Sequence, residues 1–136
     1  MSAAAANLFR ITSIVILIQL LLGGLVTFNF MAPTIHIITG LIVFVLAIAT
    51  MVVTLRDNSR SSFRTLRGIS IGLVTLIVIQ MILGFVTLAS GSSVVAWVHF
   101  GVAMGIYAMS VAGSVMAFMW VNMSRARVQE PHAEGA

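Results

Sequence analysis

Long apolar runs separated by short polar breaks make up most of the sequence. Each run exceeds about 18 residues without a charged side chain in its interior, which is the length that a helix needs to cross a bilayer. The runs do not alternate as the strands of a membrane barrel do, and over such lengths in lipid a helix satisfies its own backbone hydrogen bonds. The pattern therefore predicts four transmembrane helices, at about residues 11–30, 34–55, 66–89 and 94–121.

The breaks carry residues that are typical of turns. The first, Asn29–Pro33, ends on a proline placed where a helix would begin. The third, Ser90–Ser93, is a small Ser/Gly turn whose serines can cap the next helix. The polar tail over 124–136 is expected to be frayed. The chain is therefore predicted to be a single all-α domain, an integral membrane four-helix bundle spanning residues 1–136.

Composition agrees with this class. Of the 136 residues, 60% are hydrophobic and 7% are charged, whereas a soluble domain carries about 25% charged residues. A soluble enzyme and a disordered chain are therefore both excluded. The chain has no cysteine, which excludes disulfide scaffolds, thiolate zinc sites, iron–sulfur clusters and thiol catalysis.

The positive charges predict the orientation in the membrane. All seven basic residues are arginines, and the two short turns carry no charge. With four spans, every arginine falls on one side, which the positive-inside rule makes the cytoplasm. We therefore expect a multi-pass protein of the cytoplasmic (inner) membrane with both termini inside, and no nucleic-acid partner. The first run is too long for a cleaved signal peptide and is expected to be retained. The arginines are Arg10, Arg56, Arg60, Arg64, Arg67, Arg125 and Arg127.

The two halves of the chain resemble each other. IQLLLGGLVTF at 18–28 is similar to IQMILGFVTL at 79–88, and each stretch precedes a turn and a helix with one histidine near its start. Because equivalent positions are two spans apart, both halves run in the same direction through the membrane. The sequence thus predicts two tandem helical hairpins as an internal repeat. The matched positions include Gln19 with Gln80 and His36 with His99.

His36 and His99 are the candidate ligands of a cofactor. They are the only side chains within the runs that ionise near neutral pH, and such groups inside a membrane tend to be functional. At 1.5 Å per residue both lie ~5–8 Å below the outer surface. Their helices run in the same direction, so in an up-and-down bundle they are diagonal and face each other across the core. This arrangement suits a flat cofactor between two axial ligands.

The donor set narrows the choice of cofactor. Two histidines are too few for a zinc site, and haem c is excluded because no Cys-x-x-Cys-His occurs. Bis-histidine haem b fits, with one haem between spans two and four. Chlorophyll is an alternative, and Met104 is a weaker alternative ligand. A proton relay would need carboxylates that the spans lack, and histidines can also simply bridge helices.

Small and amide residues share the depth of the histidines. Gly23, Gly24 and Gly84 are expected to leave room for the edges of a porphyrin, although glycine in membrane helices usually serves helix packing. Gln19 and Gln80 are expected either to contact the haem edge or to hydrogen-bond neighbouring helices.

The segments QLLLGGLVTF, HIITG at His36 and AWVHFG at His99 resemble signature segments of haem A synthases. The resemblance covers about Leu17–Tyr107 and implies one half of that protein, a four-helix bundle with haem-binding histidines on its second and fourth helices. It also implies that a single bundle dimerises or joins a larger membrane complex. The catalytic half of the family has a glutamate and an arginine where this chain has Pro33 and Ile38. The resemblance therefore supports haem binding more than synthase activity.

The function expected from the sequence is electron transfer through one b-type haem, or service as a haem-bearing subunit of a respiratory or redox membrane complex. The alternatives are a haem A synthase-like enzyme that modifies haem and a cofactor-free structural subunit.

Overall fold

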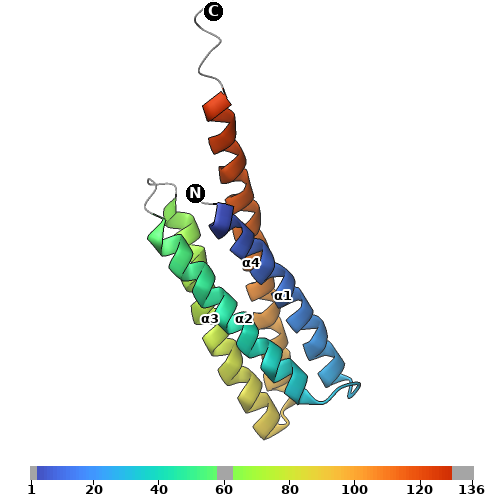
Figure 1. Cartoon of the computed structure of the whole chain (residues 1–136). Coiled ribbons are helices and arrows are strands. Elements are labelled where there is room, and N and C mark those ends of the chain that lie inside the picture. The colour runs from blue at the N-terminus through green and yellow to red at the C-terminus, as the bar shows by residue number, and fades with distance from the viewer. Residues whose placement is uncertain (1–2, 58–62, 130–136) are drawn as a thin grey trace, which may run out of the picture.

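The computed structural model describes residues 3–57 and 63–129, and all regular elements over these residues are helices. Each helix is long and apolar enough to cross a membrane. The predicted all-helical chain with four candidate spans is therefore confirmed, and the length and composition of these helices indicate a multi-pass membrane protein. The helices are α1 (Ala3–Thr27), α2 (Pro33–Arg56), α3 (Phe63–Ser90) and α4 (Ser93–Gln129) (Figure 1).

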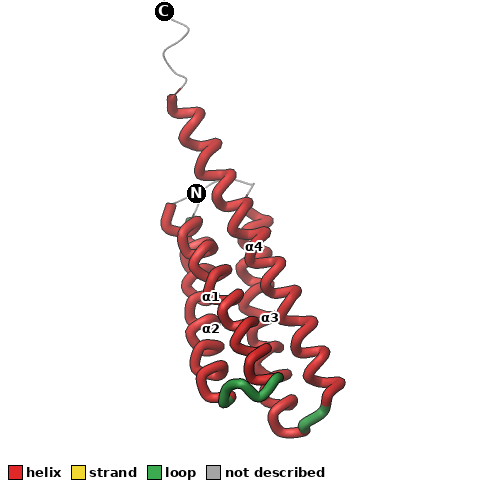
Figure 2. The backbone as a smooth tube through the Cα atoms, turned by 90° about the vertical axis from the view of Figure 1, so that its right-hand side faces the viewer, coloured by secondary structure: helices red, strands yellow, loops and turns green. Residues whose placement is uncertain are grey.

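The helices run alternately up and down, and the two short turns lie at the same end of the bundle (Figures 1 and 2). Helix α1 packs against α2 and α4, and α3 packs against the same two helices. Within the described residues, α2 does not pack directly against α4, and α1 does not pack directly against α3. The two helices that carry the histidines are therefore diagonal, as expected for an up-and-down bundle.

Each short turn contains one residue in the left-handed backbone conformation. Helix α1 ends at Thr27, earlier than the apolar run predicted, and Asn29 has a φ of 59°. Asparagine is one of the few residues besides glycine that visits this region routinely. In the second turn Gly91 has a φ of +61°, and the Ser92 hydroxyl accepts a hydrogen bond from the first turn of α4, as its capping role predicted.

Helix α4 is longer than the sequence pattern indicated. A frayed tail was expected from residue 124, which is wrong for Ser124–Gln129, because the helix continues through this segment. The segment is rich in arginine, alanine and glutamine, which are good helix formers, and Pro131 is the next helix breaker in the sequence. This end of α4 projects beyond the other helices (Figure 1). Residues 130–136, including His132, lie outside the described residues.

The buried core follows one spacing in all four helices. Buried positions recur at i, i+4, i+7 and i+11, which is the heptad spacing of left-handed helix packing. All of them lie in the half of the bundle away from the two short turns. They are Ala5, Phe9, Thr12 and Ile16 in α1; Val43, Ala47, Thr50 and Thr54 in α2; Leu66, Ser70, Leu73 and Ile77 in α3; and Ile106, Ser110, Gly113 and Ala117 in α4. In α1, Ala6 and Ser13, each next to one of these positions, are buried as well.

Polar contacts also join the helices in the half of the bundle away from the short turns, which we call the closed end. The hydroxyls of Thr12 and Thr50 are 2.9 Å apart and hydrogen-bond α1 to α2. The Arg67 guanidinium donates to the Asp57 carbonyl at 3.0 Å, where α2 ends. A cation is favourable at a helix C-terminus because the last carbonyls lack partners there.

The outward faces of the helices are apolar. Leu21, Val45 and Ile82 are each about 60% exposed, which in water would be costly for side chains of this size. Such a surface is consistent with contact to the lipid bilayer.

Candidate functional site

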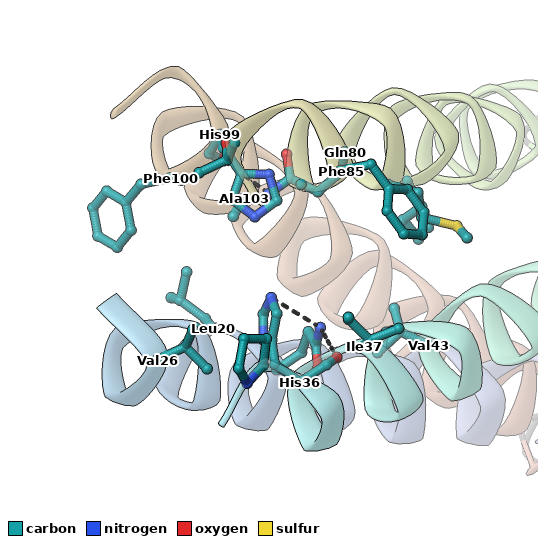
Figure 3. A pocket seen from close by; sticks show the side chains of 18 of the residues that line it. Leu20, Val26, His36, Ile37, Val43, Gln80, Phe85, His99, Phe100 and Ala103 are labelled. Carbon is teal, nitrogen blue, oxygen red and sulfur yellow. Dashed lines mark hydrogen bonds between the residues drawn. The ribbon is translucent and has the colours of Figure 1, made fainter. Parts of the chain in front are cut away.

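The end of the bundle near the short turns encloses a cavity instead of a packed core. None of the described residues in 17–27, 33–42, 78–90 and 93–105 is fully buried. Between these segments lies a mostly apolar cavity of about 240 Å³, lined by all four helices. Its lining includes Gln19, Gly23, His36, Gly40, Gln80, Gly84, His99 and Ala103 (Figure 3).

These lining residues continue the spacing of the core. His36 lies seven residues before the buried Val43, and His99 lies seven before Ile106. The same interval separates each of the other lining residues named above from a buried position on its own helix, and a heptad keeps such positions on one face. The site side chains therefore face the bundle interior for the same reason that the core does. The sequence carried this signal, but the apolar runs around it concealed the register.

The two histidines face each other across the cavity (Figure 3). Their ring centroids are 6.4 Å apart, and the ring planes meet at 75°. In both rings Nδ1 is buried and has no hydrogen-bond partner. The Nε2 atom of His36 lies on the side of the ring that faces His99 (Figure 3). The predicted juxtaposition of His36 and His99 is thus present.

Two glycines make room for the histidine rings. A Cβ atom added to Gly23 would lie 3.0 Å from Cε1 of His36, and one added to Gly84 would lie 3.2 Å from Cε1 of His99. These glycines therefore leave room for the histidine rings. That they also leave room for the edges of a porphyrin stays a prediction.

Gly24 does not line the cavity, and a Cβ added there meets nothing within 4 Å. Successive helical residues point about 100° apart, so only one of the adjacent pair Gly23 and Gly24 can face the interior.

Each glutamine hydrogen-bonds the backbone of a histidine on the next helix. Nε2 of Gln19 donates to the carbonyl of His36 at 2.8 Å, and Nε2 of Gln80 donates to the carbonyl of His99 at 2.8 Å. Of the two roles expected for these residues, hydrogen bonding between helices is the one that the distances bear out. The bonds fix the heights of α2 and α4 relative to α1 and α3 at the depth of the histidines.

The amide oxygens of the two glutamines have different surroundings. Oε1 of Gln19 accepts a hydrogen bond from the Thr39 hydroxyl, and its Nε2 lies 3.4 Å from Nε2 of His36. Oε1 of Gln80 is buried and has no partner. Val102 stands three residues after His99, where Thr39 stands three after His36. Valine has no hydroxyl to donate.

Of the other residues that the sequence singled out, Pro33 lies at the cavity, and Met104 and Ile38 do not. Met104 is 44% exposed and is not among the lining residues, so it does not face the opposite histidine. Pro33 lines the cavity, whereas Ile38 is 56% exposed and points elsewhere.

The donor set restricts what the cavity can hold. Over residues 3–57 and 63–129, no three His, Cys, Asp or Glu side chains come together as a metal site. The facing imidazoles could supply two nitrogen ligands across an apolar space, so a metal held there would need a cofactor that brings further ligands. A scan against protein-family models, a search of curated proteins and a search of solved structures each find no match to the chain.

Proposed function

We propose that the chain is a membrane protein that binds one b-type haem, with His36 and His99 as axial ligands. The observation that carries this proposal is the 6.4 Å between the two ring centroids. An imidazole nitrogen lies about 2 Å from a first-row metal ion, and its ring centre lies about 1 Å further back, so two imidazoles on opposite sides of one metal have centroids ~6 Å apart.

The residues around the histidines fit such a group. A porphyrin supplies four equatorial nitrogens, so the protein needs to provide only two axial ligands. The cavity is lined chiefly by apolar side chains such as Leu20, Ile77 and Phe85. Gly23 and Gly84 allow each imidazole to lie close against a neighbouring helix, which holds the ring in place by packing.

Electron transfer is the activity that this arrangement favours. Bound haem supplies one-electron redox chemistry. His36 and His99 would occupy both axial positions, while the apolar lining excludes water and disfavours net charge at the iron. The protein would then act as a small electron carrier or as a haem-bearing subunit of a respiratory or redox membrane complex. A homodimer or a larger complex is the expected assembly.

The proposed orientation places both termini in the cytoplasm and the haem in the outer half of the membrane. It is supported by the charges: Arg10, Arg56, Arg64 and Arg125 belong to the parts of the helices far from the short turns. The cytoplasmic side attracts such arginines. The cavity and both uncharged turns then face outward.

The proposed internal repeat is supported by the paired contacts. Both halves have a glutamine bonded to a histidine carbonyl at 2.8 Å, and both have a glycine against the same histidine. These contacts involve the segments in which the sequence resembles haem A synthases. We therefore keep a likeness to one half of that family as part of the proposal, with haem binding rather than haem modification as its content.

An absorption spectrum tests the proposal directly. The chain purified in detergent, after expression with haem in supply, should show a Soret band and the sharp visible bands of a low-spin haem, and extraction should yield haem b. His36→Ala and His99→Ala should each lose the bis-histidine spectrum. Met104→Leu, a change outside the cavity, is the matched control and should keep it.

Three other results would contradict the proposal. Absence of a Soret band favours a cofactor-free structural subunit. Extraction of haem A made by this chain alone favours the haem-modifying enzyme. An unchanged spectrum in both histidine variants would require other ligands.

A further inference from the structure

The glutamines that hydrogen-bond the backbone of the two histidines are themselves held unequally. We call each glutamine with its hydrogen bonds a clamp. The Gln19 amide is fixed at both ends, because its nitrogen donates to the His36 carbonyl and its oxygen accepts from Thr39. The Gln80 amide is fixed at one end only, because its oxygen is buried without a partner. Rotating Gln19 would break two hydrogen bonds, whereas rotating Gln80 would break one.

Thr39 also connects its own helix to the clamp. Its hydroxyl lies 2.8 Å from the carbonyl of Ile35 and 3.1 Å from that of His36. The amide of Gln19, the carbonyl of His36 and the hydroxyl of Thr39 thus form a closed set of contacts between α1 and α2. The equivalent set between α3 and α4 lacks the hydroxyl, because Val102 occupies that position.

A second sequence difference strengthens the inequality. A Cβ atom on Gly40 would lie 2.9 Å from Nε2 of Gln19, so only glycine leaves the amide where it is. Four residues after His99 the chain has Ala103, which carries that Cβ atom. Gln19 can therefore come within 3.4 Å of the His36 ring. The first half thus has a glycine and a hydroxyl donor beside its glutamine, whereas the second half has alanine and valine at the corresponding positions.

We infer that Gln19 and Gln80 are positioning residues for the two ligands, and that His36 is the anchored ligand and His99 the yielding one. This inference rests on the proposed haem function, since it assigns unequal roles to the two ligands of that haem. A buried acceptor without a partner is an energetic penalty, so the α3–α4 side of the site is the side that gives way first.

Removing each imidazole in turn tests which histidine is the anchor. His99→Gly should keep a five-coordinate haem, and added imidazole should restore a six-coordinate spectrum. His36→Gly should lose most of its haem under the same conditions. Equal retention in the two variants, or better retention in His36→Gly, would overturn the inference.

Two nearly isosteric exchanges test the clamps themselves. Val102→Thr supplies the missing donor to Gln80, and Thr39→Val removes the donor from Gln19. In cofactor-free protein, Val102→Thr should raise the melting temperature and Thr39→Val should lower it. In the reduced, haem-loaded protein, carbon monoxide serves as the probe. Its association should be about threefold slower in Val102→Thr, as expected for one interhelical hydrogen bond in a membrane protein.

These measurements separate the two proposals. If the unaltered chain binds no haem, the proposed function fails and the assignment of ligands fails with it. If the chain binds haem, but carbon monoxide association does not change in Val102→Thr and the melting temperature changes in neither Val102→Thr nor Thr39→Val, the proposed function stands and the inference is wrong.

Discussion

At the scale of single residues, the site depends on small side chains as much as on its two histidines. The ring of His36 lies where a side chain on Gly23 would be, and the ring of His99 lies where one on Gly84 would be. Glycine in the interior of a helix costs about 1 kcal/mol relative to alanine. Its presence at both positions therefore indicates that the space it leaves for a histidine ring matters more than the helix stability that alanine would add.

Gly23→Ala and Gly84→Ala should both weaken haem binding. The new methyl group forces each imidazole to shift by a few tenths of an ångström, and overpacking of this kind costs about 1–3 kcal/mol. The effect should be larger for Gly23→Ala, where the contact would be 3.0 Å against 3.2 Å at Gly84. Titration of cofactor-free protein with haem measures it.

Gly24→Ala is the matched control, because a Cβ there meets nothing within 4 Å. It should bind haem as the unaltered chain does, and its melting temperature should be unchanged or slightly higher, since alanine favours helix. If Gly24→Ala weakened haem binding as much as Gly23→Ala, contact with the imidazole would not be the cause.

At the scale of helices, the closed end of the bundle depends on close approach between α1, α3 and α4. A Cβ on Gly113 would lie 2.7 Å from Cε1 of Phe9 and 3.0 Å from Cγ2 of Ile69. Phe9 is fully buried, so its ring has no free space into which to move. The three helices are thus held at a distance that only glycine permits in α4.

Gly113→Ala should destabilise the bundle by about 1–3 kcal/mol through overpacking. A lower melting temperature in detergent would show this, while the haem spectrum of the folded fraction should not change, because Gly113 does not line the cavity. Gly68→Ala in α3, where an added Cβ meets nothing within 4 Å, provides the comparison. Equal melting temperatures for these two variants would show that the close packing of α1 and α3 against Gly113 has no specific role in stability.

Some of these helix features follow from sequence and others do not. Apolar runs predict the spans, and counting spans places His36 and His99 on diagonal helices. The core register is harder to recognise, because fully buried positions such as Thr12, Ser70 and Ser110 are small and polar while many large apolar residues face outward. In lipid, apolar side chains are favourable on the outside of the bundle as well as inside, so hydrophobicity does not indicate which residues are buried.

The hydrogen bonds of the glutamines could not be predicted either. Their partners are backbone carbonyls of another helix, and the relative heights of two helices are not encoded in the apolar pattern of either one. The continuation of α4 to Gln129 was missed for a different reason. Hydropathy marks where a helix leaves lipid, whereas helix propensity decides where it ends.

At the scale of the whole molecule, the bundle is packed at one end and hollow at the other. All fully buried positions lie away from the two short turns, and the cavity with both histidines lies next to them. Arg10 and Arg125 belong to the packed end, and in the proposed orientation, which follows the positive-inside rule, that end faces the cytoplasm. Orientation in the membrane therefore decides on which side the proposed haem accepts and donates electrons.

Single cysteines can report this orientation, because the chain has none of its own. Phe30 lies in the first short turn and is 78% exposed, and Ser124 lies in α4 beyond the other helices. In intact cells, Phe30→Cys should react with a membrane-impermeant maleimide, whereas Ser124→Cys should react only after the membrane is opened. Both substitutions lie outside the core and the cavity, so the haem spectrum should be retained and serves as the check on folding. Labelling in the opposite order would invert the topology and place the haem near the cytoplasm, where its partners would be soluble reductants or oxidants of the cell interior.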